Sequence, residues 1–433
     1  MTMSPMSRRD VLKVSAQIAA GGLIAPIALG RSANIVGQDV IRVGVIGCGG
    51  RGTGAAVNSL EAHECTRIVA LADLMPDRVQ SSFGQLNSDE IKERFGDRIS
   101  IPKDHCFSGL DAYRKLLALP DIDLVILATS PGFRPTHFEA AVAAGKHVFM
   151  EKPVAVDPVG VRKVIAAGEV ATSKGLSVVT GTQRRHEDTY LEAMERVHAG
   201  DLGEIMAGRC YWNQGALWVH NRRPEYSDLE WQCRNWLYFT WLSGDHIVEQ
   251  HVHNIDVMNW VLGGPPVRCV GMGGRQSRTG EEYGHIYDHF AIEYEYANGV
   301  CVSSMSRQIE GTPGRVEEVV VGSKGTLRMS PGRAEITGKS SWRAKEETTN
   351  PYVQEHVNLI RSIRGEGPKL NEARRIAEST LTAIMGRMSA YTGQVVTWDF
   401  ALKESTLDLM PPDLASGSIA PWSVAIPGKT KLV

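Results

Sequence analysis

The fold of this 433-residue chain is decided by Ile41-Arg42-Val43-Gly44-Val45-Ile46-Gly47-Cys48-Gly49-Gly50-Arg51-Gly52. The first six residues are mostly apolar and β-branched, which predicts a buried parallel strand. The glycines follow at G-x-G-x-x-G spacing, and a helix-compatible stretch runs from Gly54. Gly47 allows a tight turn, Gly49 lets the backbone approach a ligand, and Gly52 lets helix and strand pack closely. Strand, glycine loop and helix in this order predict the first unit of a doubly wound α/β domain.

This loop also predicts a dinucleotide site, because backbone N–H groups at the start of a helix attract a pyrophosphate. The loop residues assigned to the cofactor are Gly47, Gly49, Gly50, Arg51 and Gly52. Asp73 ends the next predicted strand, where a carboxylate accepts hydrogen bonds from the adenosine ribose and repels a 2′-phosphate. NAD is therefore the expected cofactor, with NADP as the alternative because Arg78 lies nearby.

Two domains are expected in the mature chain. Strands and helices alternate up to about Arg185, which predicts a Rossmann-type parallel sheet over residues 38–186. Beyond it, hairpin-like turns such as Asn298-Gly299 join successive strands, which predicts an α+β domain with an open antiparallel sheet over 187–405. Residues 406–433 are rich in Pro and Gly and are expected to form an extended tail.

The first 36 residues are expected to be an export signal. Arg8 and Arg9 precede an apolar run from Val14 to Leu29, which is typical of the twin-arginine route. That route predicts a periplasmic or otherwise extracytoplasmic protein. The apolar run is just long enough to remain as a membrane anchor, but no other segment is, so no span is expected in the mature form.

Charge and cysteine content exclude several classes of protein. Lys and Arg number 47 against 49 Asp and Glu, so the chain lacks the basic excess that nucleic-acid binding requires. The seven cysteines are scattered and form no CxxC pair, which favours free thiols over a zinc finger or a disulfide framework.

A second cluster, Gly145-Lys146-His147-Val148-Phe149-Met150-Glu151-Lys152-Pro153, ends a predicted strand. Lys152 would lie at the carboxyl edge of the sheet, where ligands bind and where a lysine can transfer protons. Pro153 restricts Lys152 to extended backbone angles. Taken alone, Glu-Lys-Pro is more typical of a solvated surface turn.

The glycine loop, Ala128-Thr129-Ser130-Pro131 followed by His137, and Gly145–Pro153 together resemble the glucose–fructose oxidoreductase/inositol dehydrogenase (Gfo/Idh/MocA) family. The similarity runs from about Val40 to about Leu402. The resemblance implies an open sheet whose outer face often mediates oligomerisation, hence a homo-oligomer, either dimer or tetramer. It implies that Lys152 is a catalytic or substrate-binding lysine. The further cofactor contacts predicted on this basis are Thr129, Ser130, His137, Glu151 and Lys152.

A third cluster matches the family pattern Asp-x-Gly-x-His-x-x-Asp. In this chain the matching positions are Glu249, His251, His253 and Asp256. The resemblance makes His253 an acid/base beside Lys152, while Glu249 keeps a carboxylate on a longer arm. His251 departs from the glycine of the pattern. The residues predicted to be catalytic are Lys152, His253, Glu249 and Asp256.

The spacing of this cluster supports a site independently. His246, Glu249, His253 and Asp256 recur at intervals of three, four and three, which predicts one stripe along a helix. Titratable groups gathered on one face are typical of a site, and a solvated helix face is the alternative. Two His and two carboxylates could bind Zn²⁺ or Mn²⁺, but the spacing is not that of H-E-x-x-H, and no metal is predicted.

The predicted substrate is a carbohydrate, a glycoside or a polyol. Residues 211–241 are dense in Trp and Arg, which suit the apolar faces and hydroxyl rims of sugars. The substrate-binding residues predicted are Arg184, Trp236, Glu249 and His253. We expect NAD-dependent hydride transfer with a retained cofactor, because free NAD is not expected outside the cytoplasm. A redox-neutral NAD-dependent glycoside hydrolase and a non-catalytic sugar-binding protein with structural cofactor remain alternatives.

Overall fold

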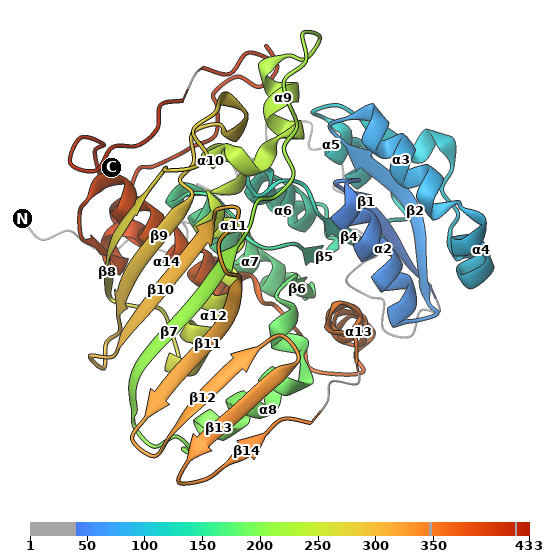
Figure 1. The fold of residues 1–433 in the computed structure, drawn as a ribbon. Helices are drawn as coiled ribbons and strands as arrows, with labels where there is room; N and C mark the ends of the chain where they lie inside the picture. The colour runs from blue at the N-terminus through green and yellow to red at the C-terminus, as the bar shows by residue number, and fades with distance from the viewer. Residues whose placement is uncertain (1–39, 346–348, 421) are drawn as a thin grey trace, which may run out of the picture. The chain divides into compact units, whose positions relative to one another are not determined.

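The structure is a computed structural model that describes residues 40–345, 349–420 and 422–433 (Figure 1). The predicted export signal lies outside the described residues. Within the described part of the chain, no helix is both long and apolar enough to cross a membrane.

The N-terminal domain is built on a six-stranded sheet of order β3-β2-β1-β4-β5-β6, in which every neighbouring pair is parallel. The strands are β1 (Ile41–Ile46), β2 (Thr66–Asp73), β3 (Cys106–Ser108), β4 (Leu124–Leu127), β5 (His147–Met150) and β6 (Val178–Thr180). The central strands β1, β4 and β5 are buried almost throughout, as expected of a sheet covered on both faces. The predicted Rossmann-type sheet is confirmed.

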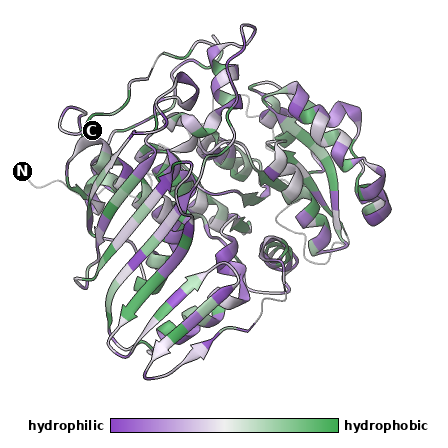
Figure 2. Cartoon of the chain, viewed as in Figure 1, coloured by the Kyte–Doolittle hydropathy of each residue, from purple (hydrophilic) through white to green (hydrophobic). Residues whose placement is uncertain are grey.

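Helices connect these strands. They are α2 (Gly50–Ala62), α3 (Pro76–Leu86), α4 (Asp89–Phe95), α5 (Ala112–Leu117), α6 (Arg134–Ala143) and α7 (Pro158–Ser173). Hydrophilic residues dominate α4, as Figure 2 shows, because its outer face meets water. The chain enters the second domain through α8 (Asp188–His198).

The C-terminal domain is built on a nine-stranded sheet of order β14-β13-β12-β11-β7-β10-β9-β8-β15. The strands are β7 (Ile205–Gln214), β8 (Arg268–Gly274), β9 (His289–Glu295), β10 (Cys301–Gln308), β11 (Arg315–Gly322), β12 (Gly325–Ser330), β13 (Arg333–Gly338), β14 (Trp342–Arg343) and β15 (Val396–Thr397). The predicted antiparallel sheet is confirmed with one exception, since β7 and β10 pair in parallel. The exception arises because β7 comes first in the chain but lies between β10 and β11.

Helices of this domain carry or support the candidate site. They are α9 (Asp228–Arg234), α10 (Thr240–Ser243), α11 (His246–Glu249), α12 (Val252–Leu262), α13 (Pro351–Arg364) and α14 (Ala373–Thr392). After Glu404 the described chain forms no further helix or strand.

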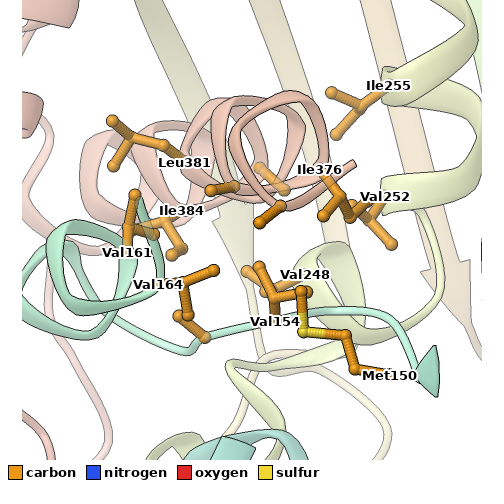
Figure 3. Close-up of a cluster of buried hydrophobic side chains, with 14 of the residues drawn as sticks. Met150, Val154, Val161, Val164, Val248, Val252, Ile255, Ile376, Leu381 and Ile384 are labelled. Carbon is orange, nitrogen blue, oxygen red and sulfur yellow. The ribbon is translucent and has the colours of Figure 1, made fainter. Parts of the chain in front are cut away.

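One hydrophobic core continues from the Rossmann domain into the C-terminal domain. Figure 3 shows Met150 and Val154, which flank the Glu-Lys-Pro triplet, packed near Val248 and Val252 of α11 and α12. Side chains of α7 and α14 close the same cluster, among them Val164, Ile376, Leu381 and Ile384. The two chain segments that carry Lys152 and Glu249 are thus fixed on both sides by buried apolar contacts.

Candidate active site

The residues predicted to bind a dinucleotide surround one cavity of about 580 Å³. This volume lies within the range of about 300–1,000 Å³ usual for ligand pockets. The predicted residues that line it are Gly47, Gly49, Gly50, Arg51, Asp73, Thr129, Ser130 and His137. Among the described residues, Gly52, Glu151 and Lys152 belong to the prediction but do not line the cavity.

The glycine loop has the backbone that a dinucleotide cradle needs. Gly47 has φ +102°, and a Cβ there would lie 2.4 Å from the carbonyl carbon of Ala128. A Cβ on Gly52 would lie 1.8 Å from the Gly47 oxygen, so Gly52 acts by close packing, outside the cavity wall. Gly49 and Gly50 meet nothing within 4 Å, which leaves the start of α2 open toward the cavity. The loop therefore fits the pyrophosphate of NAD.

Asp73 lies at the carboxyl end of β2 and lines the same cavity. Its Oδ2 accepts the Cys48 N–H at 2.7 Å and its Oδ1 accepts the Met75 N–H at 2.9 Å. A carboxylate can accept about four hydrogen bonds, so both oxygens retain capacity for ribose hydroxyls. Burial raises the pKa of Asp73 despite these two donors.

The wall that follows β4 is neutral and aromatic. The His137 ring stands 3.2 Å from the Thr129 hydroxyl and stacks on Phe133 at 5.8 Å. Burial, aided by the charge of Arg134, lowers the pKa of His137 to about 3. His137 is therefore an uncharged group of the cavity wall at neutral pH.

The guanidinium of Arg51 does not point freely at a ligand. It forms a short ion pair with Glu151 and a second one, at 3.2 Å, with Glu355 of α13. It also lies over the Tyr352 ring, 5.0 Å from the centroid. Burial and the charge of Glu151 raise the pKa of Glu355 well above its usual value. Arg51 thus ties the glycine loop to the residue that precedes Lys152.

Lys152 and Glu249 meet across the domain boundary. Lys152 Nζ donates to the Glu249 backbone oxygen at 2.7 Å and to its Oε1 at 3.1 Å. The two side chains are only 12% and 8% exposed, so the pair is shielded from solvent. The ammonium has three N–H donors, which leaves one for a further acceptor. Glu249 Oε2 is buried and has no hydrogen-bond partner among the described residues.

His253 is buried beside a tryptophan. Its ring stacks on Trp212 of β7 with centroids 5.6 Å apart, and the Arg184 guanidinium lies 5.7 Å from the same indole. Burial, together with the charges of Lys152 and Arg184, lowers the pKa of His253 well below its usual value. The imidazole is therefore neutral at neutral pH, and one of its ring nitrogens can accept a hydrogen bond from a substrate hydroxyl.

Arg184 and Asp256 belong to other networks. Arg184 is buried in a short ion pair with Glu318, whose other oxygen accepts the Tyr190 hydroxyl at 2.8 Å. Asp256 accepts two hydrogen bonds from Arg185, at 2.8 and 3.0 Å. Although burial opposes it, the charge of Arg185 holds the pKa of Asp256 below its usual value. Both residues stabilise the walls of the site.

The predicted stripe is divided between two helices. α11 ends at Glu249 and α12 begins at Val252, so His246 and Glu249 lie on one helix and His253 and Asp256 on the next. All four side chains are buried, so the alternative of a solvated helix face does not apply. In the described part of the chain, no three His, Cys, Asp or Glu side chains gather as a metal site would require.

Trp236 lines the dinucleotide cavity, together with Trp218. The two rings lie 6.2 Å apart, on the C-terminal-domain side of that cavity. The structure therefore places Trp236 beside the cofactor residues and does not bring it to Lys152.

Two residues that sequence reasoning missed position the site. Arg134 is fully buried and donates to the carbonyls of Thr129 and, at 2.7 Å, Pro153, which joins the loops after β4 and β5. Asp245 has φ +74°, a backbone conformation costly for a non-glycine residue, and its carboxylate receives the His246 and Tyr287 N–H groups. The sequence does contain a signal for Arg134, because it is the one charged residue in the otherwise apolar segment Pro131-Gly132-Phe133-Arg134-Pro135.

Comparison with known proteins agrees with this geometry. Residues 41–182 match the sequence model described as "Oxidoreductase family, NAD-binding Rossmann fold", and residues 190–328 match the "GFO/IDH/MocA C-terminal domain". The chain belongs to the Gfo/Idh/MocA oxidoreductase family. It is accordingly an NAD-binding enzyme of the oxidoreductase class, as predicted.

Three similar proteins illustrate the breadth of the family. The chain is 30% identical over 317 residues to inositol 2-dehydrogenase 3 of Saccharopolyspora erythraea, covering 70% of this chain and 78% of that one. It is 26% identical over 353 residues to a glycosyl hydrolase family 109 protein of Porphyromonas gingivalis, covering 80% of this chain and 69% of that one. In fold it resembles the WlbA dehydrogenase of Bordetella pertussis in complex with NADH and UDP-GlcNAcA, with a TM-score of 0.62 and 20% sequence identity. The superposition covers 83% of this chain and 98% of that one.

Proposed function

We propose that this Gfo/Idh/MocA oxidoreductase oxidises a secondary hydroxyl of a carbohydrate or polyol with NAD. The observation that carries the proposal is the buried group of Lys152, Glu249 and His253. It offers one ammonium N–H, one unpartnered carboxylate oxygen and one neutral imidazole. A polyol presents neighbouring hydroxyls that can use these groups together.

Each of the three groups has a separate task in this proposal. Bound NAD supplies the hydride acceptor. Lys152 donates a hydrogen bond to the reacting oxygen and stabilises the negative charge that grows there. His253 accepts the hydroxyl proton, and Glu249 Oε2 accepts a hydrogen bond from a neighbouring hydroxyl, which fixes the ring orientation.

A panel of polyols and sugars tests the proposal. Purified protein is loaded with NAD, and the near-ultraviolet absorbance of reduced nicotinamide is followed after each addition. At least one inositol, aldose or glycoside is expected to raise the absorbance in the parent protein. No change with any member of the panel would contradict the proposal and favour the non-catalytic sugar-binding role.

Redox-neutral glycoside hydrolysis is the second candidate, because relatives from glycosyl hydrolase family 109 match up to 80% of this chain. In that reaction the sugar is oxidised, the glycoside eliminated, water added and the sugar reduced again. Incubation of a glycoside without added NAD separates the two candidates. Free sugar and aglycone in excess over bound nucleotide indicate hydrolysis, and a single oxidised product indicates net oxidation.

We also propose that the protein is exported folded, by the twin-arginine route, with its cofactor already bound. The support is Arg8-Arg9 before the apolar run, together with the scarcity of free NAD outside the cytoplasm. Fractionation of the native host tests this proposal. Finding the protein only in the cytoplasm, with residues 1–36 intact, would contradict it.

A homo-oligomer formed through the open sheet completes the proposal. Met272 of β8, Ala291 of β9 and Met305 of β10 stand in register, and Met272 and Met305 are exposed. Met206 and Val270 add exposed apolar area to this sheet. Exposed apolar patches of this kind mark association surfaces. Light scattering should show a dimer or tetramer, which Met272→Glu shifts toward monomer.

A further inference from the structure

One wall of the dinucleotide cavity comes from the C-terminal domain, opposite the glycine loop and β2. Residues 217–236, which we name the clasp, form the connection between β7 and α10 and include α9. The clasp residues that line the cavity are Trp218, His220, Cys233, Arg234 and Trp236. The cavity predicted to hold the cofactor is therefore lined by residues of both domains.

The clasp is joined to the Rossmann domain by an ion pair at the edge of this cavity. Arg234 donates two hydrogen bonds, at 2.9 Å each, to the two carboxylate oxygens of Asp77. Asp77 lies in the first turn of α3, four residues after Asp73, the predicted ribose ligand. The hydrogen bonds from Arg234 lower the pKa of Asp77. A two-point guanidinium–carboxylate pair is stronger and more directional than a single contact.

Other contacts make the clasp a preformed unit. Glu230 accepts the Arg234 Nε–H at 3.0 Å, so the guanidinium is held from behind while it reaches Asp77. The Trp231 indole N–H donates to the His220 carbonyl at 3.0 Å. The Leu229 N–H donates to the Gly417 carbonyl at 3.0 Å, which fastens the clasp to the C-terminal tail. These contacts, together with the burial of Leu229 and Trp231 in one hydrophobic cluster, fix the clasp beside the Rossmann domain.

We propose that the clasp retains the dinucleotide between turnovers and that the Asp77–Arg234 pair is its latch. This inference rests on the proposed function, which requires NAD in the cavity. In this proposal the pair holds the clasp against the Rossmann domain, so it slows the departure of a bound dinucleotide past the clasp. Loss of the Asp77–Arg234 pair should therefore raise the rate of cofactor release, while the positions of Lys152, Glu249 and His253 stay unchanged.

The test uses full-length protein loaded with NAD and mixed with excess isotope-labelled NAD. The exchange of bound nucleotide is followed over time by mass spectrometry. Arg234→Ala and Asp77→Asn are each expected to raise the exchange rate about threefold to fivefold, the change expected for an ion pair whose carboxylate side chain is 57% exposed. Arg268→Ala is the matched control, because Arg268 forms an exposed pair with Glu295 at 2.8 Å and neither residue lines the cavity. Its exchange rate should match that of the parent.

A charge-swapped variant distinguishes a latch from a general electrostatic effect. Asp77→Arg combined with Arg234→Asp and Glu230→Gln restores the pair with reversed polarity and removes the neighbouring carboxylate that would repel the new aspartate, so a latch predicts an exchange rate within about twofold of the parent. Single variants within twofold of the parent, or a swapped protein that exchanges as fast as the single variants, would overturn the proposal. A parent protein that binds no nucleotide would instead contradict the proposed function itself.

Discussion

The dinucleotide cavity and the Lys152 group lie at the same edge of the Rossmann sheet but are built in opposite ways. The cavity is open space bounded by glycines and backbone N–H groups, with the charged side chains of Arg51, Asp73, Arg78 and Arg234 on its walls. The Lys152 group is closely packed, and its charges are paired with one another and shielded from solvent. A site that binds a large ligand needs open volume, whereas a site that transfers a proton needs side chains held in fixed positions.

The anchoring of the two regions differs as well. The glycine loop is held by its own backbone, with Gly47 and Gly52 in direct contact. Lys152 and Glu249 are 97 residues apart and are brought together by the shared core around Val154 and Val248. We therefore expect that a substitution in the Lys152 group leaves NAD binding unchanged.

Loss of the lysine should have the largest effect. Lys152→Met removes the ammonium that stabilises charge on the reacting oxygen, and turnover should fall at least about a hundredfold. The amount of bound NAD should stay at the parent level, because Lys152 does not line the cavity. Steady-state rates and nucleotide content measure the two properties separately. Lys163→Met, at an exposed position of α7, serves as the control. Loss of bound NAD in Lys152→Met would show that the regions are not separable.

Two glycines of α2 offer a matched pair for the cavity side. Gly52→Ala places a Cβ against the Gly47 oxygen and should cost about 1–3 kcal/mol of unfolding free energy and weaken NAD binding. Gly54→Ala meets nothing within 4 Å and should stabilise the helix by up to about 1 kcal/mol. Urea unfolding and titration with NAD check both. Equal effects from the two variants would refute the role given to Gly52.

The carboxylate of Asp73 should set the choice of nucleotide. Asp73→Asn removes the charge that binds ribose hydroxyls and repels a 2′-phosphate, so the ratio of NAD to NADP affinity should fall about tenfold. Titration of each nucleotide into nucleotide-free protein measures this ratio. An unchanged ratio would mean that another residue makes the distinction.

The smallest expected effect concerns pH. His356 is buried against Phe149, and burial, with the charge of Arg51, lowers its pKa to about 3. The unfolded chain takes up a proton near pH 6.5 that the folded chain refuses, so stability falls as pH drops from 6.5 toward 3. His356→Leu should make the fall shallower by up to about 1.4 kcal/mol per pH unit. Unfolding curves between pH 7 and pH 5 check this, and parallel slopes would contradict it.

Much of the cavity could be predicted from sequence because its requirements are local. A positive φ at Gly47 and a close contact at Gly52 demand glycine at fixed spacing, and the structure places both as expected. The strand β7 escaped prediction because Ile205–Gln214 mixes glycine, arginine and aromatic residues without clear alternation. The fold class was therefore predictable, and the parallel β7–β10 pair was not.

The Lys152 group depended on resemblance, since spacing cannot show which elements a residue will face. The helical spacing predicted that Asp256 acts together with His253. In the structure, however, Asp256 accepts hydrogen bonds from Arg185, which lies at the end of the Rossmann domain. Trp212 likewise reaches His253 only through the sheet, across 41 residues of sequence. Long-range contacts of this kind are set by the packed core and not by local pattern.

Transfer of a labelled hydride shows whether NAD accepts hydrogen from the carbon of the substrate that is oxidised. A polyol that raises the nicotinamide absorbance is prepared with deuterium on the carbon that is oxidised, and the bound nucleotide is then examined by mass spectrometry. If the hydride passes from the substrate carbon to NAD, the nicotinamide in the parent protein gains one deuterium, and the nicotinamide in Lys152→Met gains none within the same time. Oxidised sugar that forms while the nucleotide stays free of deuterium would contradict it.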